Sequence, residues 1–134
     1  MPEPRRPSSP PIDAIVPVLR VVDIVRSMTW YRDVLGFVGE AVGPPGRPSF
    51  AILSRDGVEL MLQRVRQDVG ASRSATAVGG GWDVYLRIAD AEAAWKAIQA
   101  QVPDLAPIVI QEYGCRELAV TDPDGHVLVL GDCT

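Results

Sequence analysis

The sequence contains an internal repeat, and this repeat limits the folds that the chain can adopt. The segment LRVVD at 19–23 returns as LRIAD at 86–90, and FAILSRDGVELML at 50–62 returns as LAVTDPDGHVLVL at 118–130. The two matches occur in the same order and at nearly the same offset, 67 and 68 residues. The pattern indicates a tandem duplication of a module of about sixty residues.

Both modules predict the same order of secondary structure. An apolar strand leads to Asp23 or Asp90, and each aspartate is suited to cap the N-terminus of the helix that follows it. Apolar residues then recur at helical spacing, and the two helices are expected to end at Gly36 and at Pro103. The predicted strands are 14–22, 37–43, 48–54 and 58–64 in the first module and 82–88, 106–111, 115–121 and 126–131 in the second. The sequence therefore predicts a βαβββ unit that is used twice.

A chain of 134 residues is the usual size of one domain. We expect that domain over residues 12–134, with modules at about 12–66 and 82–134 joined by a Gly/Ala/Ser-rich linker at 67–81. Residues 1–11 contain five prolines and almost no apolar side chain, so this segment is expected to be a disordered arm.

Composition limits the partners of the protein. Hydrophobic residues make up 47% of the chain and charged residues 22%, as in ordinary soluble domains. The longest apolar run, at 14–19, is far shorter than the ~20 residues of a membrane-spanning helix. The net charge of -4 would repel a phosphate backbone. The sequence thus predicts neither a membrane nor a nucleic acid as partner.

The two cysteines and the first residues bear on the compartment. Cys115 and Cys133 are too few and too far apart for a disulfide framework, and Cys115 is expected to be an inert thiol. The start, MPEPRRPSSPP, lacks the apolar stretch of a secretory signal. We expect a protein of the reducing cytoplasm.

Two stretches at opposite ends of the chain carry a family resemblance. VPVLRVVDIVRSMTWYRDVLGF at 16–37 combines an apolar strand with Asp23, Ser27, an aromatic pair and a final Leu-Gly-Phe. This pattern resembles the first strand and helix of the vicinal oxygen chelate superfamily, which includes glyoxalase I, extradiol dioxygenases and bleomycin-resistance proteins. YGCRELAVTDPDGHVLVLG at 113–131 is similar to the last hairpin of the bleomycin-resistance branch. The resemblance implies an α+β fold in which two tandem βαβββ modules form a cup-shaped mixed sheet.

The resemblance also identifies where a metal would be held. Enzymes of the superfamily bind one divalent ion inside the cup through His, Glu or Gln side chains. The corresponding positions in this sequence are Val16, Met61, Asp83 and Val129. Valine and methionine do not ligate a hard metal, and one aspartate cannot hold it alone. The resemblance therefore implies a protein without metal or other cofactor, which argues against lyase, isomerase or dioxygenase chemistry.

Other residues with chemical potential have ordinary structural explanations. His126 is the only histidine, and a single histidine after a turn is usually a polar residue at a strand end. Asp122 and Asp124 belong to the sequence DPDG, which is typical of a β-turn. Cys115 has no histidine near it in the sequence to activate it as a nucleophile. None of these residues predicts a catalytic centre.

Strand alternation predicts which side chains line the cup. If the four aligned positions face the cup, residues two places away face it as well, and they form a mixed face. This face carries Val18, Arg20, Glu59, Gln63, Tyr85, Arg87 and Val127. The opposite face is wholly apolar and is expected to pack on the helices. A mostly apolar concavity with a few polar groups is typical of a small-molecule site. The alternative is that the charged residues of this face and Asp83 pair with one another in solvent or at a subunit interface.

Tyr113 and the charge of the second module indicate the kind of ligand. Tyr113 opens the closing motif, where the resemblance places an aromatic-Gly pair beside the binding groove. Glu112 and Glu117 stand next to it, and residues 74–134 carry three basic and nine acidic residues. Aromatic faces beside carboxylates favour a flat or cationic organic molecule. The predicted ligand-binding residues are Arg20, Glu59, Asp83, Tyr85, Arg87 and Tyr113.

The resemblance implies a homodimer that sequesters an antibiotic, such as a glycopeptide of the bleomycin class, or a related metabolite. The sheet edges that each module exposes also favour pairing of two chains. Two alternatives stay open at this point. One is a metal-dependent enzyme of the glyoxalase or dioxygenase type, and the other is a structural or regulatory dimer without a ligand.

Overall fold

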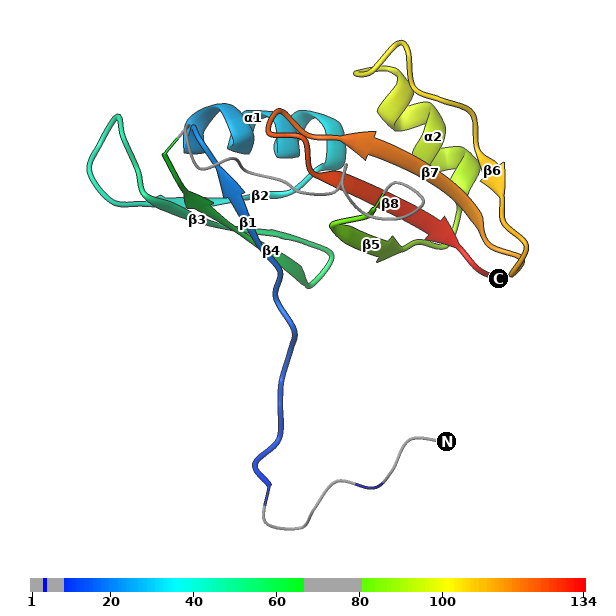
Figure 1. Ribbon diagram of the computed structural model, residues 1–134, viewed down its shortest axis with the longest axis horizontal. Coiled ribbons are helices and arrows are strands. Elements are labelled where there is room, and N and C mark those ends of the chain that lie inside the picture. Colours follow the sequence, from blue (N-terminus) through cyan, green and yellow to red (C-terminus); the bar gives the residue numbers. More distant parts are fainter. Residues whose placement is uncertain (1–3, 5–8, 67–80) are drawn as a thin grey trace.

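The computed structural model describes residue 4 and residues 9–66 and 81–134. Most of the arm expected at 1–11 and nearly all of the linker expected at 67–81 lie outside these described residues. The described segment before the first strand is extended and exposed, and it leads away from the body of the protein (Figure 1).

The first module forms one sheet and one helix. Strand β1 (Val18–Val21) precedes helix α1 (Ile24–Leu35), and strands β2 (Val38–Val42), β3 (Phe50–Arg55) and β4 (Val58–Arg64) follow. The strand order in the sheet is β1-β4-β3-β2, and only β1 and β4 run parallel to each other.

The second module repeats this arrangement. Strand β5 (Val84–Arg87) precedes helix α2 (Ala91–Gln99), and strands β6 (Val109–Ile110), β7 (Arg116–Thr121) and β8 (Val127–Asp132) follow. The strand order is β5-β8-β7-β6, again with a single parallel pair, β5 and β8. Each module thus makes its own four-stranded mixed sheet, and the predicted α+β fold of two βαβββ modules is confirmed.

Both helices begin where the capping residues predict. Asp23 and Asp90 each accept a hydrogen bond of 3.0 Å from the backbone N–H three residues later. Helix α1 ends at Gly36, whose φ of 71° lies in the left-handed region that glycine favours. Helix α2 ends at Gln99, four residues before Pro103, and the chain then continues in a turn. Among the described residues, no helix is long and apolar enough to cross a membrane.

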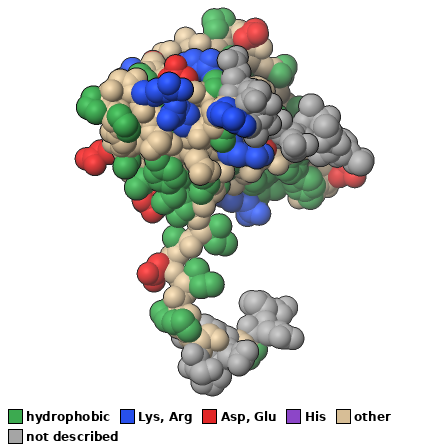
Figure 2. Space-filling view, turned by 60° about the vertical axis from the view of Figure 1, so that its left-hand side comes forward, with side chains coloured by type: hydrophobic (Ala, Val, Ile, Leu, Met, Phe, Trp, Pro, Cys, Tyr) green, Lys and Arg blue, Asp and Glu red, His purple; other side chains and the backbone are tan. Residues whose placement is uncertain are grey.

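The two faces of each sheet differ as the alternation predicts. The residues expected to pack on the helices are buried or half-buried: Leu19, Val21, Leu60, Leu62, Val84, Leu86, Ile88, Leu128 and Leu130. They form one core with residues of both helices, including the fully buried Tyr31. In Figure 1 both helices lie along the upper side of the sheets, and the N-terminal segment leaves from the opposite side. Hydrophobic side chains gather on that underside and along the segment (Figure 2).

A buried polar cluster joins the two modules. The hydroxyl of Tyr31 in α1 donates a hydrogen bond of 2.7 Å to Asp122 Oδ2, which also lies 2.8 Å from Nδ1 of His126. The next aspartate, Asp124, accepts a hydrogen bond of 3.0 Å from the backbone N–H of Val22. His126 and Asp122 are 2% and 4% exposed, so they are interior residues rather than the polar turn residues that the sequence suggested. The DPDG turn therefore connects the second module to the first.

Candidate functional site

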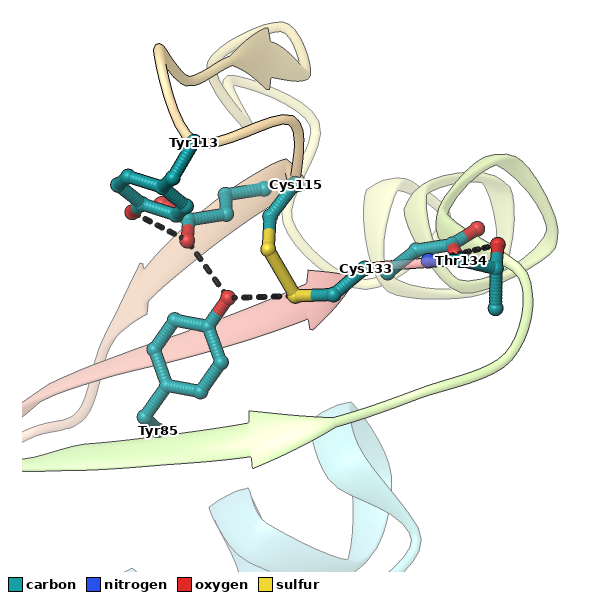
Figure 3. The surroundings of a disulfide bond; sticks show 7 residues. Tyr85, Tyr113, Cys115, Cys133 and Thr134 are labelled. Atoms are coloured by element: carbon teal, nitrogen blue, oxygen red, sulfur yellow. Dashed lines mark hydrogen bonds between the residues drawn. A yellow bond between two sulfur atoms is a disulfide. The ribbon is translucent and has the colours of Figure 1, made fainter. Parts of the chain in front are cut away.

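A buried carboxylate between two tyrosines marks the end of the second sheet. Tyr85 of β5 and Tyr113 of the loop before β7 each donate a hydrogen bond of 2.6 Å to Glu117 Oε2 (Figure 3). Glu117 is only 4% exposed, whereas Tyr113 is 59% exposed. The carboxylate therefore lies beneath the two rings, and Tyr113 presents its ring to solvent.

Local sequence explains how these side chains come together. Leu118 and Val120 of β7 point to the helices, so Glu117 points to the opposite face, which it shares with Tyr85. Glu117 lies opposite Gly131 of β8 in the strand register. A Cβ at Gly131 would collide with the hydroxyl of Tyr85. Glycine at this position therefore allows the ring of Tyr85 to reach across β8 to the carboxylate.

The environment keeps both phenols protonated at neutral pH. The hydrogen bond to Glu117, followed by burial and the negative charge of that carboxylate, raises the pKa of Tyr113 to about 12. Burial, followed by the hydrogen bond to Glu117, also raises the pKa of Tyr85 above its ordinary value. Both hydroxyls are thus donors to the carboxylate rather than bases.

Cys115 and Cys133 form a disulfide beside this cluster, and the expectation that Cys115 is an inert free thiol is wrong. The bridge joins the residue before β7 to the residue after β8, with a Cα–Cα distance of 4.1 Å. The register pairs Arg116 with Asp132, so the two cysteines face each other at the next position along the hairpin. The hydroxyl of Tyr85 lies 3.4 Å from Sγ of Cys133 (Figure 3). The 18-residue separation in the sequence concealed this pairing.

Aromatic and cationic groups surround the same carboxylate. The ring centroids of Trp82 and Tyr85 lie 5.6 Å apart, and the guanidinium carbon of Arg87 lies 6.0 Å from the centroid of Tyr85. Trp82 is 51% exposed. Exposed ring faces beside a buried carboxylate can stack on a flat molecule and attract a cation. We define Trp82, Tyr85, Arg87, Tyr113 and Glu117 as the tyrosine–glutamate site.

The structure brings together only part of the predicted site. Tyr85, Arg87 and Tyr113 belong to the tyrosine–glutamate site, whereas Arg20 and Glu59 lie exposed on the other sheet, at positions opposite Gln63 and Ser54. Among the described residues, no ion pair joins Arg20, Glu59 and Arg87 to one another.

The structure gives Asp83 a role other than the predicted one, and it adds Glu117 and Trp82 to the site. Asp83 accepts a hydrogen bond of 2.8 Å from the backbone N–H of Val127, and its carboxylate thus helps to fix the start of β8. In the sequence Glu117 is only one of several acidic residues near Tyr113, and no sequence pattern distinguishes Trp82. Alternation along the strands from Leu118 and from Tyr85 was the signal that could have identified Glu117, while Trp82 stands before β5 and carries no such signal.

The chain matches the sequence model of one protein family. Residues 12–130 match the family model of the Glyoxalase/Bleomycin resistance protein/Dioxygenase superfamily. The chain belongs to this superfamily. No curated protein matches the chain in sequence.

Solved structures share the fold at low sequence identity. A glyoxalase-related enzyme from Clostridium phytofermentans has a TM-score of 0.76 at 17% identity, covering 95% of this chain and 99% of its own. The bleomycin-binding protein from Streptomyces verticillus, in complex with copper(II)-bleomycin, has a TM-score of 0.65 at 22% identity, covering 91% and 97%. A lactoylglutathione lyase from Agrobacterium tumefaciens has a TM-score of 0.63 at 18% identity, covering 92% and 95%. Enzymes and binding proteins alike thus share the fold with this chain.

The residues present do not fit the divalent ion that the superfamily's enzymes hold. Val16 and Val129 offer no donor atom, Met61 offers only a thioether, and Asp83 is engaged with the backbone of β8. In the part of the chain that the structure describes, no three His, Cys, Asp or Glu residues are grouped so that they could hold a metal ion. We therefore derive no reaction through a metal.

Proposed function

We propose that this protein binds a flat, basic organic molecule at the tyrosine–glutamate site, without metal, and acts by sequestration in the manner of bleomycin-resistance proteins. The observation that carries the proposal is Glu117, a buried acceptor that two tyrosine hydroxyls hold in place beside exposed aromatic rings. This arrangement is preorganised, because the carboxylate needs no rearrangement before a ligand arrives.

The comparisons support a binding role. Several structures with this fold are antibiotic-binding proteins, including the bleomycin-binding protein from Streptomyces verticillus and TnmS3 from a Streptomyces species. A bleomycin-class glycopeptide combines planar aromatic groups with positive charge, which matches the chemistry of Trp82, Tyr113 and Glu117.

The side chains available for catalysis favour binding over turnover. Cys115 and Cys133 are in a disulfide, and His126 is buried against Asp122 at the far end of the hairpin. The tyrosine–glutamate site thus contains donors, an acceptor and ring faces, but no nucleophile paired with a base.

We also propose that the functional unit is a homodimer. Ile12 and Ile15 of the N-terminal segment are 86% and 93% exposed, and Val18 and Ile52 are exposed on the free face of the first sheet. Apolar side chains on an extended segment and on an adjoining sheet face favour burial against a second copy. Light scattering at micromolar concentration should give twice the chain mass, and a monomer would contradict the proposal.

The disulfide makes the proposed cytoplasmic location testable. Structural disulfides persist in oxidising compartments and are rare in the cytoplasm. Rapid alkylation of intact cells should modify Cys115 and Cys133 if the protein is cytoplasmic. Protection of both cysteines would place the protein in an oxidising compartment.

Calorimetry with metal-free bleomycin tests the proposed function. Glu117→Gln should weaken binding by about tenfold or more, because it removes the negative charge at the centre of the site. Trp82→Ala should weaken binding through the loss of ring stacking. The matched control is Glu112→Gln, which removes the same charge from an exposed residue of the loop before β7 and should bind nearly as the wild type does.

Two results would refute the proposal. Equal losses in Glu117→Gln and Glu112→Gln would show that only the overall negative charge matters. Absence of heat with bleomycin and with other planar cations would reject the site itself.

A further inference from the structure

A cavity lined by arginines lies in the first module, away from the tyrosine–glutamate site. It has a volume of about 550 Å³ and opens where β1 and β4 end. Arg26, Arg47, Arg64 and Arg66 line it, together with Asp23. Figure 2 shows Lys and Arg side chains gathered on the body of the protein above the N-terminal segment. This concentration of positive charge is notable in a chain with 17 acidic and 13 basic residues.

Three separate elements hold these arginines in place. Arg64 ends β4, and its backbone N–H donates a hydrogen bond of 2.9 Å to the carbonyl of Ser49. Arg26 lies in the first turn of α1 and contacts Asp124 at 3.3 Å. Arg47 lies in the loop GPPGRPS, whose three prolines restrict the backbone. The cavity wall is thus built by the fold.

Two of the arginines have no acidic partner. Arg32, Arg55 and Arg116 each form an ion pair with a nearby carboxylate. Arg47 and Arg64 form none with the described residues, and Nε of Arg64 is buried without a hydrogen-bond acceptor among them. A buried charged donor without an acceptor is unfavourable, and an oxygen of an anionic ligand would satisfy it.

The charges of the cavity indicate the class of anion. Arg47 and Arg64 give the cavity two guanidinium groups that have no carboxylate partner among the described residues. A ligand with two adjacent anionic groups would pair with both. Planar guanidinium groups match the oxygens of phosphoryl groups, with two parallel hydrogen bonds for each pair.

We propose that this arginine cavity binds a small anion with adjacent phosphoryl groups, such as the diphosphate part of a metabolite. The proposal is independent of the function assigned to the tyrosine–glutamate site, because the two sites share no residue. The expected contacts run from Arg64, with its buried Nε, and from Arg47 to the phosphoryl oxygens. Arg26, which is shared with Asp124, would add charge rather than a full pair.

Calorimetry with inorganic pyrophosphate at low salt is the test. The wild type should bind, and Arg64→Gln and Arg47→Gln should each weaken binding by about tenfold. Arg47 is exposed in a loop, so its variant should fold even if Arg64→Gln does not. The matched control is Arg32→Gln, which removes the same charge from α1 outside the cavity and should bind within about twofold of the wild type.

Nuclear magnetic resonance gives a direct readout of the proposed contact. The Nε–H signal of Arg64 should shift on addition of pyrophosphate. No binding by the wild type at millimolar pyrophosphate, or an equal loss in Arg32→Gln, would overturn the proposal. Tighter binding of citrate than of pyrophosphate would overturn the assignment to phosphoryl groups.

Discussion

Removal of one hydroxyl from the core should measure how strongly the two modules are joined. Tyr31 is fully buried, and its hydroxyl donates a hydrogen bond of 2.7 Å to Asp122 across the module boundary. Burial, followed by the negative charge of Asp122, raises the pKa of Tyr31, so the phenol is a permanent donor. Tyr31→Phe deletes this bond and leaves the ring in place.

The structure sets the size of the effect. A hydrogen bond to a charged group contributes about 1.5–3 kcal/mol to the free energy of unfolding. Asp122 keeps its hydrogen bonds from His126, whose backbone N–H lies 2.9 Å from Oδ1 and whose ring nitrogen lies 2.8 Å from Oδ2. The carboxylate is therefore not left without donors in the variant. We expect Tyr31→Phe to lower the free energy of unfolding by about 2 kcal/mol, at the middle of that range.

Urea denaturation measures this loss, with the same substitution at an exposed site as control. Tyr113→Phe also deletes a hydrogen bond to a carboxylate, at 2.6 Å, but Tyr113 is 59% exposed. The freed space lies next to solvent and Tyr85 still donates its hydrogen bond to Glu117, so the cost should stay below about 0.5 kcal/mol. Both variants should keep the wild-type dependence of the free energy of unfolding on urea concentration. Equal losses in the two variants would refute the argument that burial sets the magnitude.

Three further predictions concern stability and the site. Cys133→Ser should lower the free energy of unfolding by about 3 kcal/mol, because the bridge to Cys115 closes a loop with a sequence separation of 18 residues. Thermal unfolding measures this loss, and treatment of the wild type with dithiothreitol should reproduce it. Gly131→Ala should displace the ring of Tyr85 and lower the free energy of unfolding by about 1–3 kcal/mol. Calorimetry should then show a loss of ligand binding, and a wild-type affinity would contradict the position of the ring. Burial alone would raise the pKa of Asp122, but hydrogen bonds from His126 and from Tyr31 outweigh it and lower this pKa. The ionised carboxylate therefore stabilises the fold at pH values above the ordinary aspartate pKa of 3.8. This contribution should disappear as the pH falls through the lower pKa of the folded state. Urea titrations from pH 7 to acid should show a smaller decline in Asp122→Asn than in the wild type.

The architecture could be predicted from the sequence because its signals are local. The repeat at an offset of 67 residues fixes two equal modules, and Asp23 and Asp90 cap their helices by contacts within three residues along the chain. Alternation along a strand separates core from exposed positions, since successive side chains point to opposite faces. These properties need no knowledge of what lies across the sheet.

The disulfide and the buried carboxylate depended on strand register. Cys115 and Cys133 each lie nine residues from Asp124, at the centre of the DPDG turn, so the hairpin brings them face to face. The position of the turn in the sequence indicates which residues can lie opposite each other, but the strand register follows only once the type of turn is known. Glu117 was visible as an acid, yet its burial results from Tyr85 crossing Gly131, which belongs to another strand.

The predicted site residues lie on two different sheets, which shows the limit of prediction from the sequence most clearly. Alternation placed Arg20, Glu59, Tyr85 and Arg87 on equivalent faces of the repeated module, and this is correct for each strand. The repeat already assigned Arg20 and Glu59 to the first module and Tyr85 and Arg87 to the second, and the tertiary structure shows that each module forms a separate sheet. The sequence thus determined the face of each side chain, because this depends on one strand. The neighbours of each side chain depend on how β5, β7 and β8 pair and on how the two sheets share one core, which is a property of the whole chain.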